Sequence, residues 1–150
     1  MIKFIRNTSV LMLAAVVIVL TTHAGATAPP LPNPVLVFLG SEPVEISGKQ
    51  IMRYYFDVDN KAAYPAEMFA AAPDLPPCGA NTNASRTWID IYNQSGKRLN
   101  GFCALGKPAD LTKIWFALDS SEIPPSWIYI EMNDRKTGTK YKSNLAETTL

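Results

Sequence analysis

Residues 85–92 read SRTWIDIY, and this stretch decides the fold. Two kinds of side chain alternate along it, one set aliphatic or small and the other aromatic or acidic. The first set is Thr87, Ile89 and Ile91, and the second is Trp88, Asp90 and Tyr92. Successive side chains of a β-strand point to opposite faces of the sheet, so this alternation predicts a strand with one buried face.

Six further segments are short, and each is either apolar or alternates apolar and polar side chains. Turn residues separate them. They are residues 35–39, 50–59, 98–105, 111–118, 127–133 and 139–145. The side chains we expect in the core are Met52, Tyr54, Phe56 and Val58, then Ile114, Phe116 and Leu118, then Ile128, Ile130 and Met132. Outside a brief stretch at 62–72 no helical period is convincing. The sequence therefore predicts an all-β, seven-stranded antiparallel β-sandwich.

The N-terminus is typical of a secretory signal peptide. Lys3 and Arg6 precede an unbroken apolar run at 10–20, which is too short for a permanent membrane span, and small residues follow at 24–26. We expect cleavage near residue 26.

Cleavage would leave a proline-rich leader at 27–34 and a domain at 35–150 that carries a long insertion at about 60–83. His23 is the only histidine of the chain, so the mature protein would have no Ser-His-Asp triad and no histidine metal ligand. We expect no metal and no cofactor. The signal segment carries two of the fourteen basic residues and none of the thirteen acidic ones, so the mature protein would have a net charge of −1, which does not predict nucleic-acid binding. After cleavage we expect no membrane insertion.

The two cysteines, Cys78 and Cys103, are predicted to form a structural disulfide, because an exported protein matures in an oxidising compartment. Such a bridge would stabilise the fold by roughly 3 kcal/mol. A redox pair or a thiolate metal site is the alternative, but the spacing is not Cys-x-x-Cys. We expect a periplasmic or extracellular protein.

The chain resembles the fibronectin type III and wider immunoglobulin-like families. The resemblance rests on the prolines before Val35, on the segment Ile123-x-Pro125-x-x-x-Tyr129, and on the segment at 141–144 (YKSN). It implies that the third and sixth strands are sheet neighbours and that Tyr129 points inward. The alternation of residues 127–133 instead places Tyr129 on the outer face, unless the phase of the strand slips.

The most specific functional pattern is aromatic. Trp88, Tyr92, Trp127 and Tyr129 all lie on the polar side of the third and sixth segments. If these strands are neighbours, the rings form one exposed strip. Such a strip would suit a sugar face, a hydrophobic peptide or a partner protein.

Two other arrangements would bury these rings. The insertion could fold over the sheet with Phe69 and Leu75 packing on the rings, or the strand register could slip. Trp115 belongs to the other sheet by the same reasoning, where we interpret it as an isolated surface ring.

The loop at 76–86 is rich in turn-forming side chains. It is either a rigid connection pinned by Cys78 or a polar ligand loop in which Arg86 contacts an anion or a carboxylate.

Catalytic and metal patterns are weaker. Asp57 and Asp59 have the spacing of half a calcium loop but lack its glycine and its final glutamate. Asp90, Glu131 and Asp134 could form a carboxylate pair of a glycoside hydrolase only if two of them share a cleft.

These patterns favour an exported, non-catalytic binding or interaction module for an unknown protein, peptide or glycan, which would use the aromatic sheet face and the 76–86 loop. A structural subunit that assembles through its edge strands is the alternative. A carboxylate-dependent hydrolase is the third hypothesis.

Overall fold

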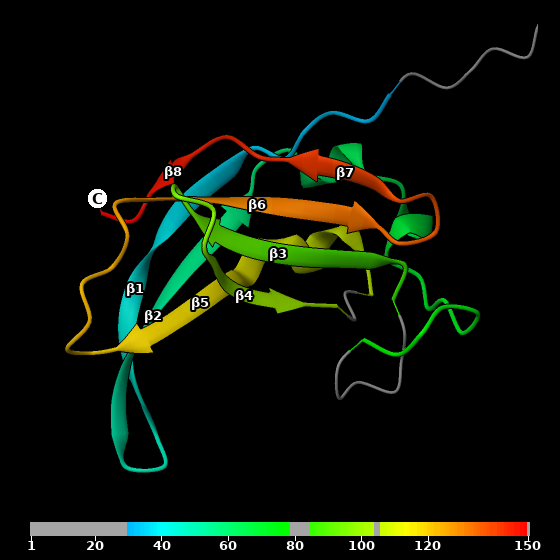
Figure 1. The fold of residues 1–150 in the computed structure, drawn as a ribbon. Helices are drawn as coiled ribbons and strands as arrows, with labels where there is room; N and C mark the ends of the chain where they lie inside the picture. Colours follow the sequence, from blue (N-terminus) through cyan, green and yellow to red (C-terminus); the bar gives the residue numbers. More distant parts are fainter. Residues whose placement is uncertain (1–29, 79–84, 104–105, 150) are drawn as a thin grey trace, which may run out of the picture.

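The computed structural model describes residues 30–78, 85–103 and 106–149, and this part of the chain is all-β. The predicted signal peptide at 1–26 lies outside the described residues. One antiparallel sheet has three strands in the order β1-β2-β5 (Figure 1). Its strands are β1 (Leu36–Ile46), β2 (Lys49–Val58) and β5 (Ile114–Asp119).

The second antiparallel sheet has five strands. Its main order is β4-β3-β6-β7, and the short β8 pairs with the first residues of β6. The strands are β3 (Thr87–Asn93), β4 (Arg98–Phe102), β6 (Trp127–Asp134), β7 (Thr139–Lys142) and β8 (Ala146–Glu147). The third and sixth strands are thus neighbours, as the resemblance implies, and Tyr92 lies directly opposite Tyr129.

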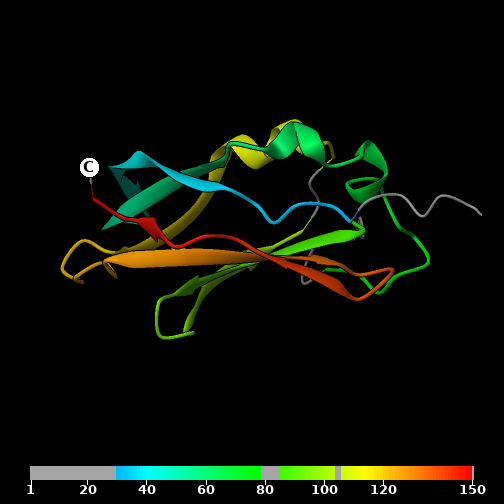
Figure 2. The same cartoon turned by 90° about the horizontal axis from the view of Figure 1, so that it is seen from above.

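The two sheets form two layers that enclose one hydrophobic core (Figure 2). The predicted inward side chains of β2, β3, β5 and β6 are buried or, at Met52 and Leu118, partly buried against the core. The alternation is therefore confirmed in phase in four strands. In the part of the chain that the structure describes, no helix is long and apolar enough to cross a membrane.

The first strand is longer than predicted. Gly40 and Pro43 do not end it, because β1 lies at a sheet edge, where a proline without an N–H and a bulge are both tolerated. The bulge falls between Phe38 and Gly40, and β1 then continues to Ile46. Ser47 and Gly48, both with positive φ, close the β1–β2 hairpin, whose tip extends beyond the rest of the molecule in Figure 1.

The strand predicted at 111–118 starts later, because its first residues belong to the 3-10 helix η3 (Pro108–Lys113). Pro108 favours a helical start, and the Asp110 carboxylate accepts hydrogen bonds from the backbone N–H groups of Gly106 and Lys107. Leu111 then turns fully into the core.

The described part of the insertion packs into the main core. It contains two short 3-10 turns, η1 (Lys61–Ala63) and η2 (Ala66–Met68), which lie on the side of the three-stranded sheet in Figure 2. Met68 and Phe69 are buried in the shared core. Phe69 is therefore a core residue, and is not a cover for the outer face of β3 and β6.

The disulfide Cys78–Cys103 is present, as predicted. Arg135 lies over it: Nη1 donates to the Cys78 sulfur and to the Ser85 carbonyl, and Nη2 donates to the Pro76 carbonyl. The base of the 76–86 loop is thus fixed to the turn after β6. Residues 79–84 of this loop lie outside the described residues.

A single side chain ties the two sheets together at one edge. Asn144 lies between β7 and β8, and its Oδ1 accepts a hydrogen bond of 2.7 Å from the Leu36 N–H. Its Nδ2 donates at 3.0 Å to the Leu36 carbonyl. Both backbone groups of a β1 residue are therefore satisfied by one amide.

Candidate functional site

The four predicted rings share the outer face of the five-stranded sheet. We call Trp88, Tyr92, Tyr129 and Trp127 the aromatic strip. Tyr129 points outward, as the alternation predicted and contrary to the orientation that the resemblance implied. Its ring stacks on that of Tyr92 with 5.2 Å between centroids. Trp127 is 38% exposed, and the other three rings are half-buried.

Two pairs of opposite charges lie on the same face as the rings of the strip. Asp90 and Glu131 are opposite each other in register, which would be unfavourable for two carboxylates without cations nearby. Arg98 on β4 contacts Asp90 at 2.5 Å, and Lys140 on β7 contacts Glu131 at 3.2 Å. The hydrogen bond to Glu131 raises the pKa of Lys140.

Two cations also contact the rings. The Arg98 guanidinium lies 5.7 Å from the centroid of Trp88, and Lys142 Nζ lies 4.0 Å from the centroid of Tyr129. Burial, followed by the nearby Asp90 and Glu131 carboxylates, raises the pKa of Tyr92. The strip thus combines partly exposed rings with compensated charges.

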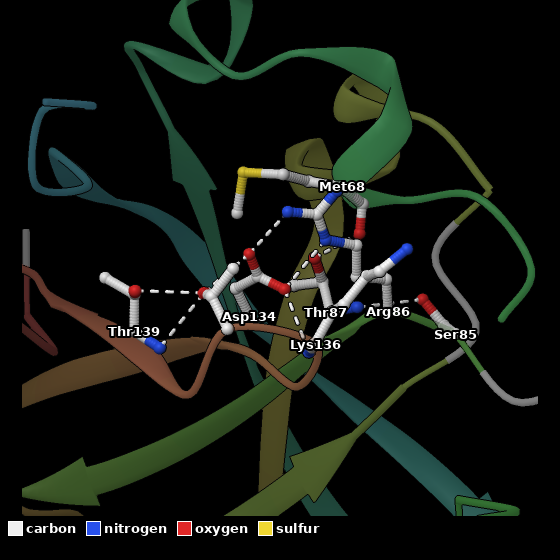
Figure 3. A network of polar contacts seen from close by, with 8 residues as sticks. Met68, Ser85, Arg86, Thr87, Asp134, Lys136 and Thr139 are labelled. Atoms are coloured by element: carbon white, nitrogen blue, oxygen red, sulfur yellow. Dashed lines mark hydrogen bonds and ion pairs between the residues drawn. The ribbon is translucent and has the colours of Figure 1, made fainter. Parts of the chain in front are cut away.

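Arg86 binds a carboxylate of its own chain (Figure 3). Its Nε and Nη2 donate to the two oxygens of Asp134 at 2.7 and 2.6 Å. Asp134 also accepts from the Lys136 N–H and the Thr137 hydroxyl. These hydrogen bonds, that of Arg86 first, lower the pKa of Asp134 to about 2. A contact between Arg86 and an external anion stays a prediction.

Two of the carboxylates considered for hydrolysis, Asp90 and Glu131, each pair with a cation. A general acid needs a raised pKa, whereas that of Asp134 is lowered. Asp57, from the half calcium loop, is bound by Lys61 at 2.8 Å. Across residues 30–78, 85–103 and 106–149, no cluster of His, Cys, Asp and Glu side chains could hold a metal ion.

A second candidate site lies on the outer face of the other sheet. It is a hollow of about 580 Å³ lined by residues 39–42 of β1, by Arg53 and Tyr55 of β2 and by Trp115 of β5. Trp115 is directly opposite Tyr55 in the β2–β5 register. Trp115 is therefore not an isolated ring, and we call this site the β1–β2–β5 hollow.

The polar groups of the hollow form one chain. The Tyr55 hydroxyl donates to Glu42, and Arg53 Nη1 donates to the Tyr55 hydroxyl at 3.3 Å. The Arg53 guanidinium lies 4.5 Å from the centroid of Trp115. The alternation in 50–59 and 111–118 places Arg53, Tyr55 and Trp115 outward, but their meeting depends on a strand register that the sequence does not state.

No family model, no curated protein and no solved structure matches the chain. The function is therefore inferred from the geometry of the two outer faces.

Proposed function

We propose that this protein is an exported, non-catalytic binding module that recognises a partner protein through the aromatic strip. Export is supported by the signal-like pattern at 1–26 and by the disulfide between Cys78 and Cys103. The absence of histidine after residue 26 and the lowered pKa of Asp134 favour binding over acid–base catalysis.

One observation carries the proposal: four large rings lie partly exposed on a single sheet face, and the described part of the insertion packs elsewhere. Tyr, Trp and Arg are the side chains most enriched where protein interfaces gain their binding energy. The strip combines these types with Asp90–Arg98 and Glu131–Lys140 pairs. A sheet face of this composition resembles protein interfaces more than it resembles the concave pockets in which small molecules are usually bound.

We infer that the two sheets form a sandwich of the immunoglobulin-like or fibronectin type III kind. The first, second and fifth strands share one sheet and the third, sixth and seventh share the other, as in immunoglobulin sandwiches. The fourth strand pairs with β3 rather than with β5. In such folds partner binding is determined by the individual surface, so the inference supports a scaffold and not a particular ligand.

Assembly through edge strands has less support. β1 is an edge of the three-stranded sheet, and it carries both a bulge and Pro43. These features are typical of edges that do not add a further strand.

The experiment compares two tryptophans that are equally exposed on opposite faces. Trp127→Ala changes the strip, and Trp115→Ala is the matched control, since each ring is 38% exposed. Extracts of the producing cells are passed over the immobilised wild type and both variants, retained proteins are quantified, and the retained partner is purified and titrated.

We expect Trp127→Ala and Tyr129→Ala to weaken partner binding about tenfold or more, and Trp115→Ala to leave it unchanged. Equal binding by all variants would show that the strip is not the interface. If Trp88→Ala and Tyr129→Ala lower stability by several kcal/mol but leave binding intact, the rings serve the fold alone.

A further inference from the structure

We propose that the β1–β2–β5 hollow is a second binding site and that its ligand is an uncharged oligosaccharide. The site lies on the sheet opposite to the aromatic strip, so it does not depend on the partner proposed there. Its volume of about 580 Å³ falls within the range of about 300–1,000 Å³ that is usual for small-molecule sites.

The shape of the hollow follows from the bulge in β1. Gly40 is opposite Tyr55 in the register and has φ 137°, a conformation that favours glycine. A Cβ at this position would meet nothing within 4 Å, so the missing side chain leaves open space beside the tyrosine ring. Across the sheet, Tyr55 and Trp115 are direct neighbours. Tyr55 and Trp115 therefore both contribute aromatic surface to one solvent-open hollow, in which the Arg53 guanidinium lies over the Trp115 ring.

The polar groups match a sugar better than an ion. Arg53 offers donors and Glu42 offers acceptors, and the Tyr55 hydroxyl joins them in one hydrogen-bonded chain. Their opposite charges compensate each other, so the site would not attract a ligand with a net charge. A sugar hydroxyl both donates and accepts, and can therefore use the guanidinium and the carboxylate together.

The aromatic side chains Tyr55 and Trp115 suit the apolar face of a sugar ring. A pyranose ring has an apolar face of C–H groups, which can pack on the Tyr55 ring and beside Trp115, while its hydroxyls reach Arg53 and Glu42. Because the hollow is open to solvent, a chain of sugar units can extend beyond it. An oligosaccharide is thus a better fit than a single enclosed sugar.

A peptide is the main competing ligand, and the backbone around the hollow opposes it. An extended peptide usually gains its affinity by pairing with a free strand edge. At this site the neighbouring edges belong to β1 and β5. In β1 the bulge between Phe38 and Gly40 interrupts the ladder and Pro43 has no N–H to donate, and in β5 the Trp115 carbonyl already accepts a hydrogen bond from the Asn100 side chain. A sugar needs no such pairing.

The test uses four uncharged tetrasaccharides: those of cellulose, chitin, starch and laminarin. Each is titrated at up to millimolar concentration into the ¹⁵N-labelled protein, and the backbone and indole N–H signals are followed by NMR. Tetragalacturonate serves as the charged probe. Trp115→Ala and Glu42→Gln change the hollow, while Trp127→Ala changes the equally exposed ring on the opposite sheet. A melting curve of each variant verifies that it is folded.

We expect at least one uncharged tetrasaccharide to shift the Trp115 indole and the Gly40 and Tyr55 amide signals. Trp115→Ala should weaken this binding about tenfold, and Trp127→Ala should not change it. Glu42→Gln, which removes a charge without removing bulk, should weaken binding several-fold and remains informative if Trp115→Ala does not fold.

Three results would overturn the proposal: no shift with any of the four sugars, equal affinity in the wild type and Glu42→Gln, or stronger binding of tetragalacturonate than of the uncharged probes. Shifts confined to Trp127 and its neighbours would place sugar binding on the strip instead. That outcome would contradict this inference and also the protein partner proposed for the strip, whereas failure at the hollow alone leaves the strip proposal standing.

Discussion

Replacing Asp134 by asparagine tests whether the buried ion pair at the end of β6 stabilises the fold. The Asp134 side chain is only 4% exposed, and both of its oxygens accept from Arg86, which is 25% exposed. Asparagine keeps the size of the side chain and removes its charge. The change therefore removes the charge and, because an amide nitrogen replaces one acceptor oxygen, also removes hydrogen bonds to that oxygen.

The expected loss of stability in Asp134→Asn follows from the pKa of Asp134. The hydrogen bonds from Arg86, and after it those from Thr137 and the Lys136 N–H, lower this pKa from 3.8 to about 2. One pKa unit corresponds to about 1.4 kcal/mol, so the ionised carboxylate stabilises the folded state by at most about 2.5 kcal/mol relative to its protonated form. Loss of a fully buried pair can cost about 3–5 kcal/mol, but the partial exposure of Arg86 allows water to compensate part of the loss.

The direction in which this stabilisation changes with pH follows from the folded and unfolded pKa values of Asp134. Because the folded pKa lies below the unfolded one, the stabilisation is fully present above about pH 4 and is lost as the pH falls toward 2. The assay is urea unfolding of the wild type and Asp134→Asn at pH 7, 4, 3 and 2. We expect a gap of about 2 kcal/mol at pH 7 that closes between pH 4 and pH 2.

The control is Asp59→Asn, which removes a carboxylate that is exposed at the end of β2. This variant should unfold within about 0.5 kcal/mol of the wild type at pH 7. A gap below about 0.5 kcal/mol for Asp134→Asn, or a gap that does not change between pH 4 and pH 2, would refute the assigned role of the ion pair.

Two further predictions concern the links between distant segments. Replacing Cys78 and Cys103 by serine should lower the free energy of unfolding by about 3 kcal/mol, because the bridge closes a loop of 25 residues, and reduction of the wild type should shift its unfolding midpoint equally. Asn144→Ala should cost about 2 kcal/mol, since it leaves both backbone groups of Leu36 without their partner. Ser121→Ala, which removes one exposed hydrogen bond to Asp119, is its control, and equal losses in the two variants would contradict the special role of Asn144.

The buried faces of the strands could be predicted because each strand has one side on a shared core. In β3 and β6 the alternation alone separated Ile89, Ile91 and Ile130 from the aromatic strip. It also gave the correct direction for Tyr129, where the family resemblance gave the opposite one. The alternation of buried and exposed side chains is a local property of one strand, so it can be recognised in the sequence without knowledge of the neighbouring strands.

The length of β1 and the hollow beside it could not be predicted in this way. Gly40 and Pro43 are strand breakers by local preference, but pairing with β2 holds them in an edge strand. The meeting of Tyr55 with Trp115 depends on the register between β2 and β5, which are separated by two strands of the other sheet. Tertiary pairing thus decides where the second candidate site lies.

The Asn144 side chain has a consequence for the free edge of β1. A primary amide carries the same donor and acceptor as a peptide group, so at Leu36 it acts as a strand one residue long. The groups it occupies would otherwise offer a foreign chain a place to begin templated fibril growth. Asn144, the bulge and Pro43 all lie along β1, and together they oppose the pairing of further chains with this edge.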